Sequence, residues 1–333
     1  MLTNGALKYH YHPAKGWLND PNGLCDFGGQ HHVFYQYCPD SETPTVMKWG
    51  HAVTRDFVSW QELGVAIDTD MPYDCRGVWS GTAIVKDGRV YAFYASIDSS
   101  GRQTISVAVS DDGSHFEKYA GNPVISEYPP EGSGDFRDPA VMESGGRYYM
   151  LVGSADTRKG SGTLLLYESG DLLSWSYSGV LMEYPDSESC ECPSFVKLKD
   201  GYLVAVSNRP KSGGHYFEVM YGQFDGRRFT PGIVSHFQKG PDEYAGQIYK
   251  DSRGRAILIS WVSGWRYRPR EKCIGCLSLP LELTVADGGI KAYPVEELRH
   301  LVGPDGCVTD AYVKETYVNG GEEVYIELTQ RPE

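Results

Sequence analysis

The chain has 333 residues, a length that suits one large domain or two smaller ones. Its 44 acidic and 31 basic residues give a formal net charge of −13, which argues against nucleic acid and anionic membrane surfaces as partners. No stretch approaches the roughly 20 apolar residues that span a bilayer, so we expect no membrane segment.

The N-terminal segment Met1–His10 lacks the basic head and apolar core of a secretory signal. The eight cysteines are too widely spread for the framework of a small secreted protein. Cys273–Cys276 is a lone CxxC pair without a second pair, which gives a zinc site little support. We therefore expect a cytoplasmic protein with reduced, mostly buried thiols and no metal.

One pattern returns five times along the chain: an apolar strand, a turn rich in Gly or Asp, and a second apolar strand. The five copies are Gly23–Tyr37, Thr82–Ser96, Ala140–Ser154, Ser194–Asn208 and Gln247–Trp261. Asp87-Gly88 and Gly145-Gly146 stand at two of the turns, and such pairs favour the turns that suit the twist of a β-hairpin. The copies therefore predict five hairpins.

Hairpins of this series lead into further strand pairs, so that each unit holds about four strands. Four such pairs are Ala52–Asp68, Val107–Gly121, Leu165–Val180 and Met220–Pro231. Four strands are the size of a propeller blade, so the sequence predicts an all-β, five-bladed β-propeller. A β-sandwich also has regular short strands, but it does not need this larger period. The best helical turn is Glu296–Arg299.

Three acids stand just before hairpins of the repeat: Asp20, Asp138 and Glu191. The innermost strand of each propeller blade begins at one end of the central channel, so residues at equivalent positions should converge there. Convergence costs charge repulsion and raises the pKa of at least one carboxyl. A protein with only a structural role has little reason to carry that cost.

Each acid also has a simpler interpretation. Asp-Pro commonly starts turns, so Asp20 or Asp138 alone would be read as a turn residue. Glu191 has no turn chemistry, and the phase that the three acids share with the repeat favours a site. Paired carboxylates are the minimum for glycoside hydrolysis. Trp17, Trp79 and Trp261 lie near the same strand starts. They could form apolar walls for a sugar, and they would be equally normal as core residues.

At this point the chain resembles the invertase and levanase family of glycoside hydrolases, family 32. The motifs run in the family's order, and they are Trp17–Gly23 (WLNDPNG), Phe34–Gln36 (FYQ), Trp49–Ala52 (WGHA), Asp56–Trp60 (DFVSW), Trp79–Gly81 (WSG), Phe136–Pro139 (FRDP), Glu191–Pro193 (ECP) and Ser278–Pro280 (SLP). Motifs of this length in a fixed order are highly specific.

The resemblance implies a five-bladed propeller followed by a β-sandwich. It implies that Asp20 is the nucleophile, Glu191 the general acid/base and Asp138 the stabiliser of the transition state. It calls for no metal or organic cofactor. Together with the tryptophans that could form sugar walls, it gives a set of candidate substrate-binding residues. These residues are Asn19, Gln36, Trp49, Trp79, Ser80, Arg137 and Trp261.

The chain departs from the family's pattern in several places. Gln36–Pro44 lacks the usual early Trp-Gly pair, Gly246 stands in place of a proline, and Leu281 stands in place of an arginine. These changes bear on substrate preference. The basic loop Trp265–Lys272 is a candidate anion site or a solvated loop.

The length also departs, because a full sandwich does not fit after residue 300. We expect a propeller over residues 1–300 and a short C-terminal β extension, a vestige of the sandwich, over 301–333. A homo-oligomer that covers the exposed flank is a hypothesis.

The sequence thus predicts a retaining glycosidase that releases terminal β-D-fructofuranosyl units from sucrose or short fructo-oligosaccharides. Its partner would be a small-molecule fructoside. A fructosyltransferase would share every catalytic residue, and a propeller that binds fructosides without turnover is the alternative from another class.

Overall fold

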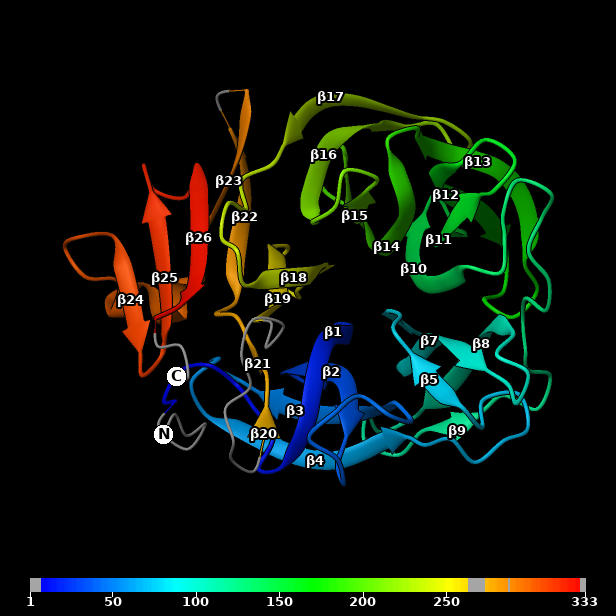
Figure 1. Cartoon of the computed structure of the whole chain (residues 1–333), viewed down its shortest axis with the longest axis horizontal. Coiled ribbons are helices and arrows are strands. Elements are labelled where there is room, and N and C mark those ends of the chain that lie inside the picture. The colour runs from blue at the N-terminus through cyan, green and yellow to red at the C-terminus, as the bar shows by residue number, and fades with distance from the viewer. Residues whose placement is uncertain (1–6, 263–272, 287, 330–333) are drawn as a thin grey trace.

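The computed structural model describes residues 7–262, 273–286 and 288–329. Five sheets of four or five strands lie around a common axis, and a sixth, three-stranded sheet lies outside the ring (Figure 1). The structure thus confirms the five-bladed β-propeller. The helical element of the described residues is the 3-10 helix η2, Glu296–Leu301, where the sequence predicts a helical turn.

The blades follow one another along the chain. Blade 1 consists of β1 (Gly16–Phe27), β2 (Gln30–Cys38), β3 (Lys48–Thr54) and β4 (Trp60–Ile67). Blade 2 consists of β5 (Gly77–Trp79), β6 (Ala83–Lys86), β7 (Arg89–Ile97), β8 (Gln103–Ser110) and β9 (Glu117–Lys118). Blade 3 consists of β10 (Phe136–Ser144), β11 (Arg147–Asp156), β12 (Ser161–Ser169) and β13 (Ser176–Tyr184).

Blade 4 consists of β14 (Ser187–Lys197), β15 (Tyr202–Pro210), β16 (Tyr216–Phe224) and β17 (Phe229–Ser235). Blade 5 consists of β18 (Glu243–Lys250), β19 (Ala256–Val262), β22 (Leu281–Ala286) and β23 (Gly289–Pro294). The inner strands contact one another around the axis in the order β1, β6, β10, β14 and β18, and β18 returns to β1. The ring is therefore closed.

All five predicted hairpins form the inner strand pairs of the blades. Asp87 and Gly88 have φ of 50° and 74°, and Gly145 and Gly146 have φ of 62° and 76°. Two consecutive residues with positive φ are what a tight hairpin turn of matching twist requires. The sequence signal and the observed turn therefore have the same physical origin.

The turns between third and fourth strands share an aspartate. Asp56 Oδ1 accepts hydrogen bonds from the backbone N–H of Val58 (2.9 Å) and Ser59 (2.7 Å). Asp171 does the same for Leu173 and Ser174, and the pattern also holds for Asp112 and Asp225. Each carboxylate satisfies two turn N–H groups, which explains why this residue type recurs with the blade.

A short segment fastens blade 5 to blade 1. β20 (Cys273–Ile274) pairs with β1, whereas β21 (Cys276–Leu277) pairs with β19. Gly275 joins them at φ 90°, and a Cβ there would lie 2.2 Å from the carbonyl oxygen of Leu18. The CxxC pair is thus part of the seam of the ring. Among the residues that the structure describes, no group of three or more His, Cys, Asp or Glu could hold a metal ion.

Six of the seven cysteine side chains that the structure describes are buried, and Cys75 is exposed. Cys25, Cys38, Cys75, Cys190, Cys192 and Cys307 are free thiols. Within the described ranges, no helix is long and apolar enough to cross a membrane.

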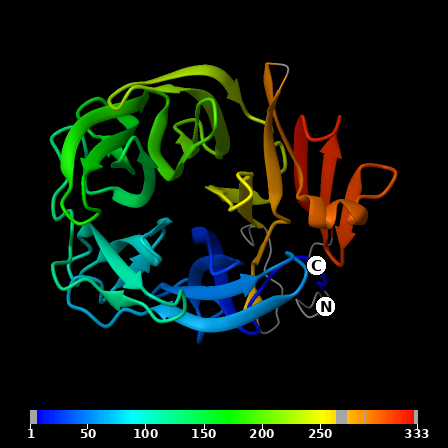
Figure 2. The ribbon, with the colours of Figure 1, turned by 180° about the vertical axis from the view of Figure 1, so that it is seen from behind.

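The outer sheet contains β24 (Cys307–Asp310), β25 (Val313–Val318) and β26 (Glu323–Leu328). Figure 2 shows it beside blade 5, where β26 contacts β23. The backbone N–H of Val324 donates to the carbonyl of Phe237, and that of Lys239 donates to the carbonyl of Val324. The sheet is therefore hydrogen-bonded to the segment that leads into β18.

A buried histidine ties the N-terminal segment to this sheet. His10 is 3% exposed, and its ring nitrogens lie 2.9 Å from Asp310 Oδ2 and 3.1 Å from Glu315 Oε1. Burial lowers the pKa of His10, but the two carboxylates outweigh burial and raise it to about 9. Glu315 Oε1 also accepts from the backbone of Leu279 (2.9 Å). His10 and its two carboxylate partners thus join three segments that are distant in sequence.

This site makes stability depend on pH. A histidine whose pKa is raised by folding makes its full contribution to stability at pH values below its pKa in the unfolded chain, near 6.5. This contribution is lost as the pH rises towards the folded pKa of about 9. We expect His10→Gln to destabilise the protein by about 3 kcal/mol at pH 6 and by much less at pH 9. Urea unfolding at both pH values measures this, with the exposed His115→Gln as control. An equal loss at both pH values would show that His10 is not charged in the fold.

Candidate active site

The inner strands share a bulge at the end of the channel where they begin. Regular pairing breaks between Leu18 and Pro21, and in the same way at Arg137/Ala140, Glu191/Ser194 and Tyr244/Gln247. Two residues of the inner strand then face one of its partner. A bulge re-aims side chains, and here it lies at every predicted catalytic residue of these strands.

The register corrects one expectation about the acids. Glu191 is the last paired residue before its bulge, Asp138 is the first residue within its bulge, and Asp20 is the second. The three acids therefore do not occupy equivalent positions of the repeat. They converge because bulges at one end of the ring turn successive residues towards the axis, and Asp138 adopts φ 58° to do so.

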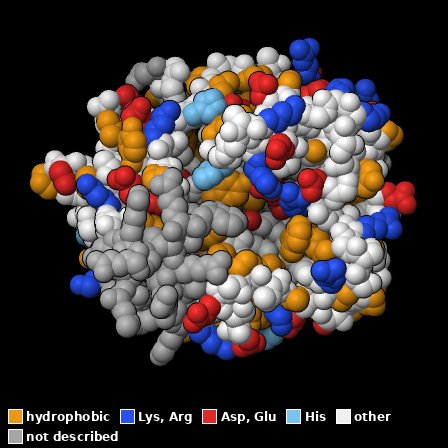
Figure 3. Space-filling view, viewed as in Figure 1, with side chains coloured by type: hydrophobic (Ala, Val, Ile, Leu, Met, Phe, Trp, Pro, Cys, Tyr) orange, Lys and Arg blue, Asp and Glu red, His pale blue; other side chains and the backbone are white. Residues whose placement is uncertain are grey.

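A cavity of about 760 Å³ opens at this end of the channel. Its lining includes Asp20, Asp138 and Glu191, together with Asn19, Gln36, Trp79, Ser80, Arg137 and Trp261. The face in Figure 3 is hollowed near its centre, and its rim shows Lys or Arg and His side chains. A cavity of this size suits a small ligand.

Trp49 is the predicted substrate-binding residue that does not line this cavity. Its ring is fully buried between Phe34 and Tyr94, and its indole N–H donates to the carbonyl of Trp79 at 2.9 Å. It lies on β3, the third strand of its blade. Trp49 therefore supports the pocket from behind.

Asp20 lies on the pocket floor with defined hydrogen-bond donors. Asn19 Nδ2 donates to Oδ1 (3.0 Å), and Ser80 Oγ donates to Oδ2 (2.7 Å). Trp17 Nε1 in turn donates to Asn19 Oδ1 (2.7 Å) and orients the amide. Burial raises the pKa of Asp20 although these bonds favour the ionised form. The carboxylate is thus fixed in position.

Asp138 is almost fully buried beside the other two acids. It is 4% exposed, and its Oδ2 accepts a hydrogen bond from the backbone N–H of Cys192 (2.8 Å). Burial raises its pKa to about 7, against the lowering effect of the Arg137 charge. Near neutral pH this carboxyl therefore holds a proton part of the time.

Glu191 is held by cations and a phenol. Arg137 Nη2 donates to Oε1 at 2.6 Å, Arg209 Nη1 lies 3.4 Å from the same oxygen, and the Tyr244 hydroxyl donates to Oε2. Burial raises the pKa of Glu191, but Arg137, Tyr244 and Arg209 together bring it below its usual value. In the free site the proton of the cluster therefore belongs to Asp138 rather than to Glu191.

The lining also includes residues that the sequence did not assign to the site, among them Cys192, Arg209, His215 and Tyr244. The Cys192 thiol lies 3.5 Å from Asp20 Oδ2 and 3.7 Å from Asp138 Oδ2, so it links two acids. Tyr244 binds Glu191, and Arg209 and His215 stand at the mouth. Cys192 and Tyr244 lie in segments that the family motifs mark, whereas Arg209 and His215 carry no signal in the sequence. The basic loop Trp265–Lys272 lies outside the described residues.

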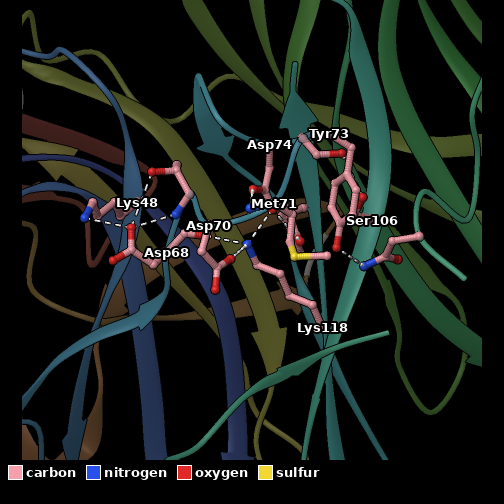
Figure 4. A network of polar contacts seen from close by, with 12 residues as sticks. Lys48, Asp68, Asp70, Met71, Tyr73, Asp74, Ser106 and Lys118 are labelled. Atoms are coloured by element: carbon pink, nitrogen blue, oxygen red, sulfur yellow. Dashed lines mark hydrogen bonds and ion pairs between the residues drawn. The ribbon is translucent and has the colours of Figure 1, made fainter. Parts of the chain in front are cut away.

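A lysine anchors the loop that delivers Trp79 and Ser80 to the pocket (Figure 4). Lys118 of β9 donates to the carbonyl of Asp68 and to the carboxylates of Asp70 and Asp74. Asp74 is fully buried and also accepts from the backbone of Met71 (3.0 Å). Lys118 thereby holds together the segment between blades 1 and 2 just before β5 begins.

We expect Lys118→Met to lower the free energy of unfolding by about 3 kcal/mol, because it leaves the Asp74 carboxylate buried without its cation. Lys48→Met is the matched control, since Lys48 pairs with the half-exposed Asp68 and should cost less than about 1 kcal/mol. Urea unfolding of both variants provides the comparison. Equal losses would refute the anchoring role of Lys118.

Comparison with known proteins agrees with this geometry. A family model described as the N-terminal domain of glycosyl hydrolases family 32 matches residues 10–294. A sucrose-6-phosphate hydrolase from Escherichia coli is 33% identical over 337 residues, which cover 93% of this chain and 69% of that relative. A similar relative from Zymomonas mobilis is covered over 62% of its length, so the chain spans about two thirds of such proteins.

Solved structures show the same fold. The structure of sucrose-6-phosphate hydrolase from Lactobacillus gasseri has a TM-score of 0.80 at 28% identity, covering 92% of this chain and 67% of that one. A β-fructofuranosidase from Bombyx mori has a TM-score of 0.85 at 24% identity, covering 98% and 89%. The chain belongs to glycosyl hydrolases family 32.

Proposed function

We propose that the chain releases terminal β-D-fructofuranosyl units from sucrose or short fructo-oligosaccharides by a retaining mechanism. The observation that carries this proposal is the convergence of Asp20, Asp138 and Glu191 in one cavity, each with different hydrogen-bond partners. Because their partners differ, the acids have different proton affinities. The mechanism requires such a difference, since the nucleophile must be ionised while the general acid carries a proton. Trp79 and Trp261 supply apolar walls for a sugar ring.

In the first step, Asp20 attacks the anomeric carbon of the fructosyl unit. The bond from that carbon to the leaving oxygen breaks, and Glu191 gives its proton to this oxygen. Asp20 suits attack because Asn19 and Ser80 hold its carboxylate still. In the second step, Glu191 takes a proton from water, the water oxygen binds the anomeric carbon, and the bond to Asp20 breaks.

The proton on Asp138 has to become available to Glu191. We propose that sugar hydroxyls draw Arg137 away from Glu191 when substrate binds, which raises the proton affinity of Glu191. Asp138 then becomes ionised and stabilises positive charge at the anomeric centre. Because the acids titrate as a coupled group, the alkaline limit of activity belongs to the cluster and lies near the Asp138 pKa of about 7.

The mouth of the cavity faces the leaving group. Arg209 is 51% exposed there, so the lining carries a partly exposed guanidinium in an otherwise acidic chain. This charge suits a phosphorylated sugar as leaving group, which places sucrose 6-phosphate among the substrates to be tested.

The experiment is fructose release from sucrose, sucrose 6-phosphate, 1-kestose, inulin and levan, with Asp20→Ala as control. Release that the variant abolishes supports the proposal and names the substrate. Oligosaccharide products in place of free fructose would instead assign a fructosyltransferase. A folded protein that binds these sugars but releases nothing would be a binding propeller.

A further inference from the structure

The guanidinium of Arg137 is shared between two carboxylates. Its Nη2 donates to Glu191 at 2.6 Å, and its Nη1 donates to Asp135 Oδ1 at 2.8 Å. The Arg137 and Glu191 side chains are 12% and 15% exposed, whereas Asp135 is 48% exposed. Asp135 therefore competes with a catalytic carboxyl for the same cation from the solvent side.

Asp135 is held firmly despite its exposed side chain. Its backbone N–H donates to Ser133 Oγ at 3.2 Å, and its carbonyl accepts a hydrogen bond from Ser154 Oγ. Ser154 lies on β11, the neighbouring strand of blade 3, and also accepts from the N–H of Ser133 (3.3 Å). Two serines thus fix the backbone that presents Asp135 to Arg137.

Gln103 reaches Arg137 from the next blade. Its Oε1 accepts from the backbone N–H of Phe136 (2.9 Å) and lies 3.4 Å from Arg137 Nη1. It stands at the start of β8 in blade 2, whereas Arg137 belongs to blade 3. Neither Gln103 nor Asp135 lines the cavity, so neither is placed to touch a sugar there.

From this geometry we propose that Asp135 and Gln103 are positioning residues, which share the Arg137 guanidinium with Glu191 and so weaken its effect on that carboxyl, so that the catalytic carboxyls keep the proton that the leaving group needs. This inference rests on the proposed function. According to this inference, two residues outside the pocket set the pH range in which the acid/base operates.

Several other groups face the same carboxyls, and the proposal takes them as a fixed background. Arg209 from β15 and the Tyr244 hydroxyl from β18 contact Glu191 directly. The Asp20, Asp138 and Cys192 side chains face Glu191 and Arg137 across the pocket floor. Asp135 differs from all of these because it removes cation charge from the cluster without occupying the pocket.

Two substitutions of almost unchanged shape test the proposal with opposite signs. Asp135→Asn removes a negative charge, so Arg137 acts more strongly on Glu191 and Asp138, and the cluster loses its proton at lower pH. Gln103→Glu adds a negative charge beside Nη1 and has the reverse effect. We expect the alkaline limb of kcat/KM to move down in Asp135→Asn and up in Gln103→Glu, each by about half a unit to one pH unit.

Glu131→Gln is the matched control, because it removes the same charge from the same segment. The Glu131 carboxylate accepts a hydrogen bond from the Tyr177 hydroxyl (3.3 Å) rather than from Arg137. Opposite shifts with an unmoved control support the proposal. Lower activity with an unmoved alkaline limb in both variants would mean that the two residues only support the fold, which overturns it. Absence of fructose release from the unmodified protein would instead refute the proposed function, and the inference with it.

Discussion

Asp20→Asn is expected to lower kcat for fructose release by about four to six orders of magnitude, since an amide cannot form the covalent fructosyl-enzyme. The change keeps the size of the side chain, and Ser80 and Asn19 can still bond to the new amide. Initial rates of fructose release measure the effect, and substrate binding by calorimetry should remain within about tenfold because contacts to the hydroxyls are kept.

Asp26→Asn is the control for Asp20→Asn. Asp26 lies on the same strand, β1, and accepts a hydrogen bond from the backbone of Ser252 (3.0 Å) rather than facing the three acids. It should keep nearly full activity. If Asp20→Asn retained more than about one hundredth of the activity, the nucleophile would have to be another group.

The second large effect is expected for Glu191→Gln. Its kcat/KM on sucrose should fall by about two to four orders of magnitude, the usual contribution of a general acid. The loss should be much smaller for an aryl fructoside, whose leaving group needs little protonation. The alkaline limb near pH 7 should disappear, because no carboxyl remains to transfer the shared proton to the leaving oxygen.

Glu188→Gln serves as the control for Glu191→Gln, because it lies three residues earlier on β14 and its side chain is exposed. It should leave the pH profile unchanged. An alkaline limb that persists in Glu191→Gln with equal losses on both substrates would exclude Glu191 as the acid.

The five hairpins were predictable because local chemistry determines them. Asp87-Gly88 and Gly145-Gly146 prefer the positive φ that a tight turn needs, and runs of apolar residues mark the strands on either side. The aspartates of the outer turns repeat for a similar local reason. Such signals act within a few residues, so a single sequence carries them completely.

The site was predictable only in outline. In a closed ring the inner strands all begin at the same end of the channel, so the meeting of the three acids could be predicted. The exact positions of Glu191 and Asp138 depend on bulges, which no local pattern marks. Trp49 was misplaced because its motif does not say which strand faces the axis. Its burial follows from packing across blades, where it meets Phe34 and Tyr94.

Contacts between distant segments were not predictable at all. Lys118 and Asp74, or His10 and Glu315, are ordinary charged residues in the sequence and become defined only when the ring closes. The electrostatics of the site has the same origin. The cation that lowers the pKa of Glu191 comes from another blade, and burial of Asp138 depends on the whole channel floor.

The covalent intermediate on Asp20 is the central claim, and it can be observed directly. Glu191→Ala should react with an aryl fructoside and then release fructose slowly, because the base for the second step is missing. Rapid quenching, digestion and mass spectrometry should find one hexosyl unit on the peptide that contains Asp20. Fructose release without any such adduct, and with the opposite anomer as the first product, would contradict the mechanism.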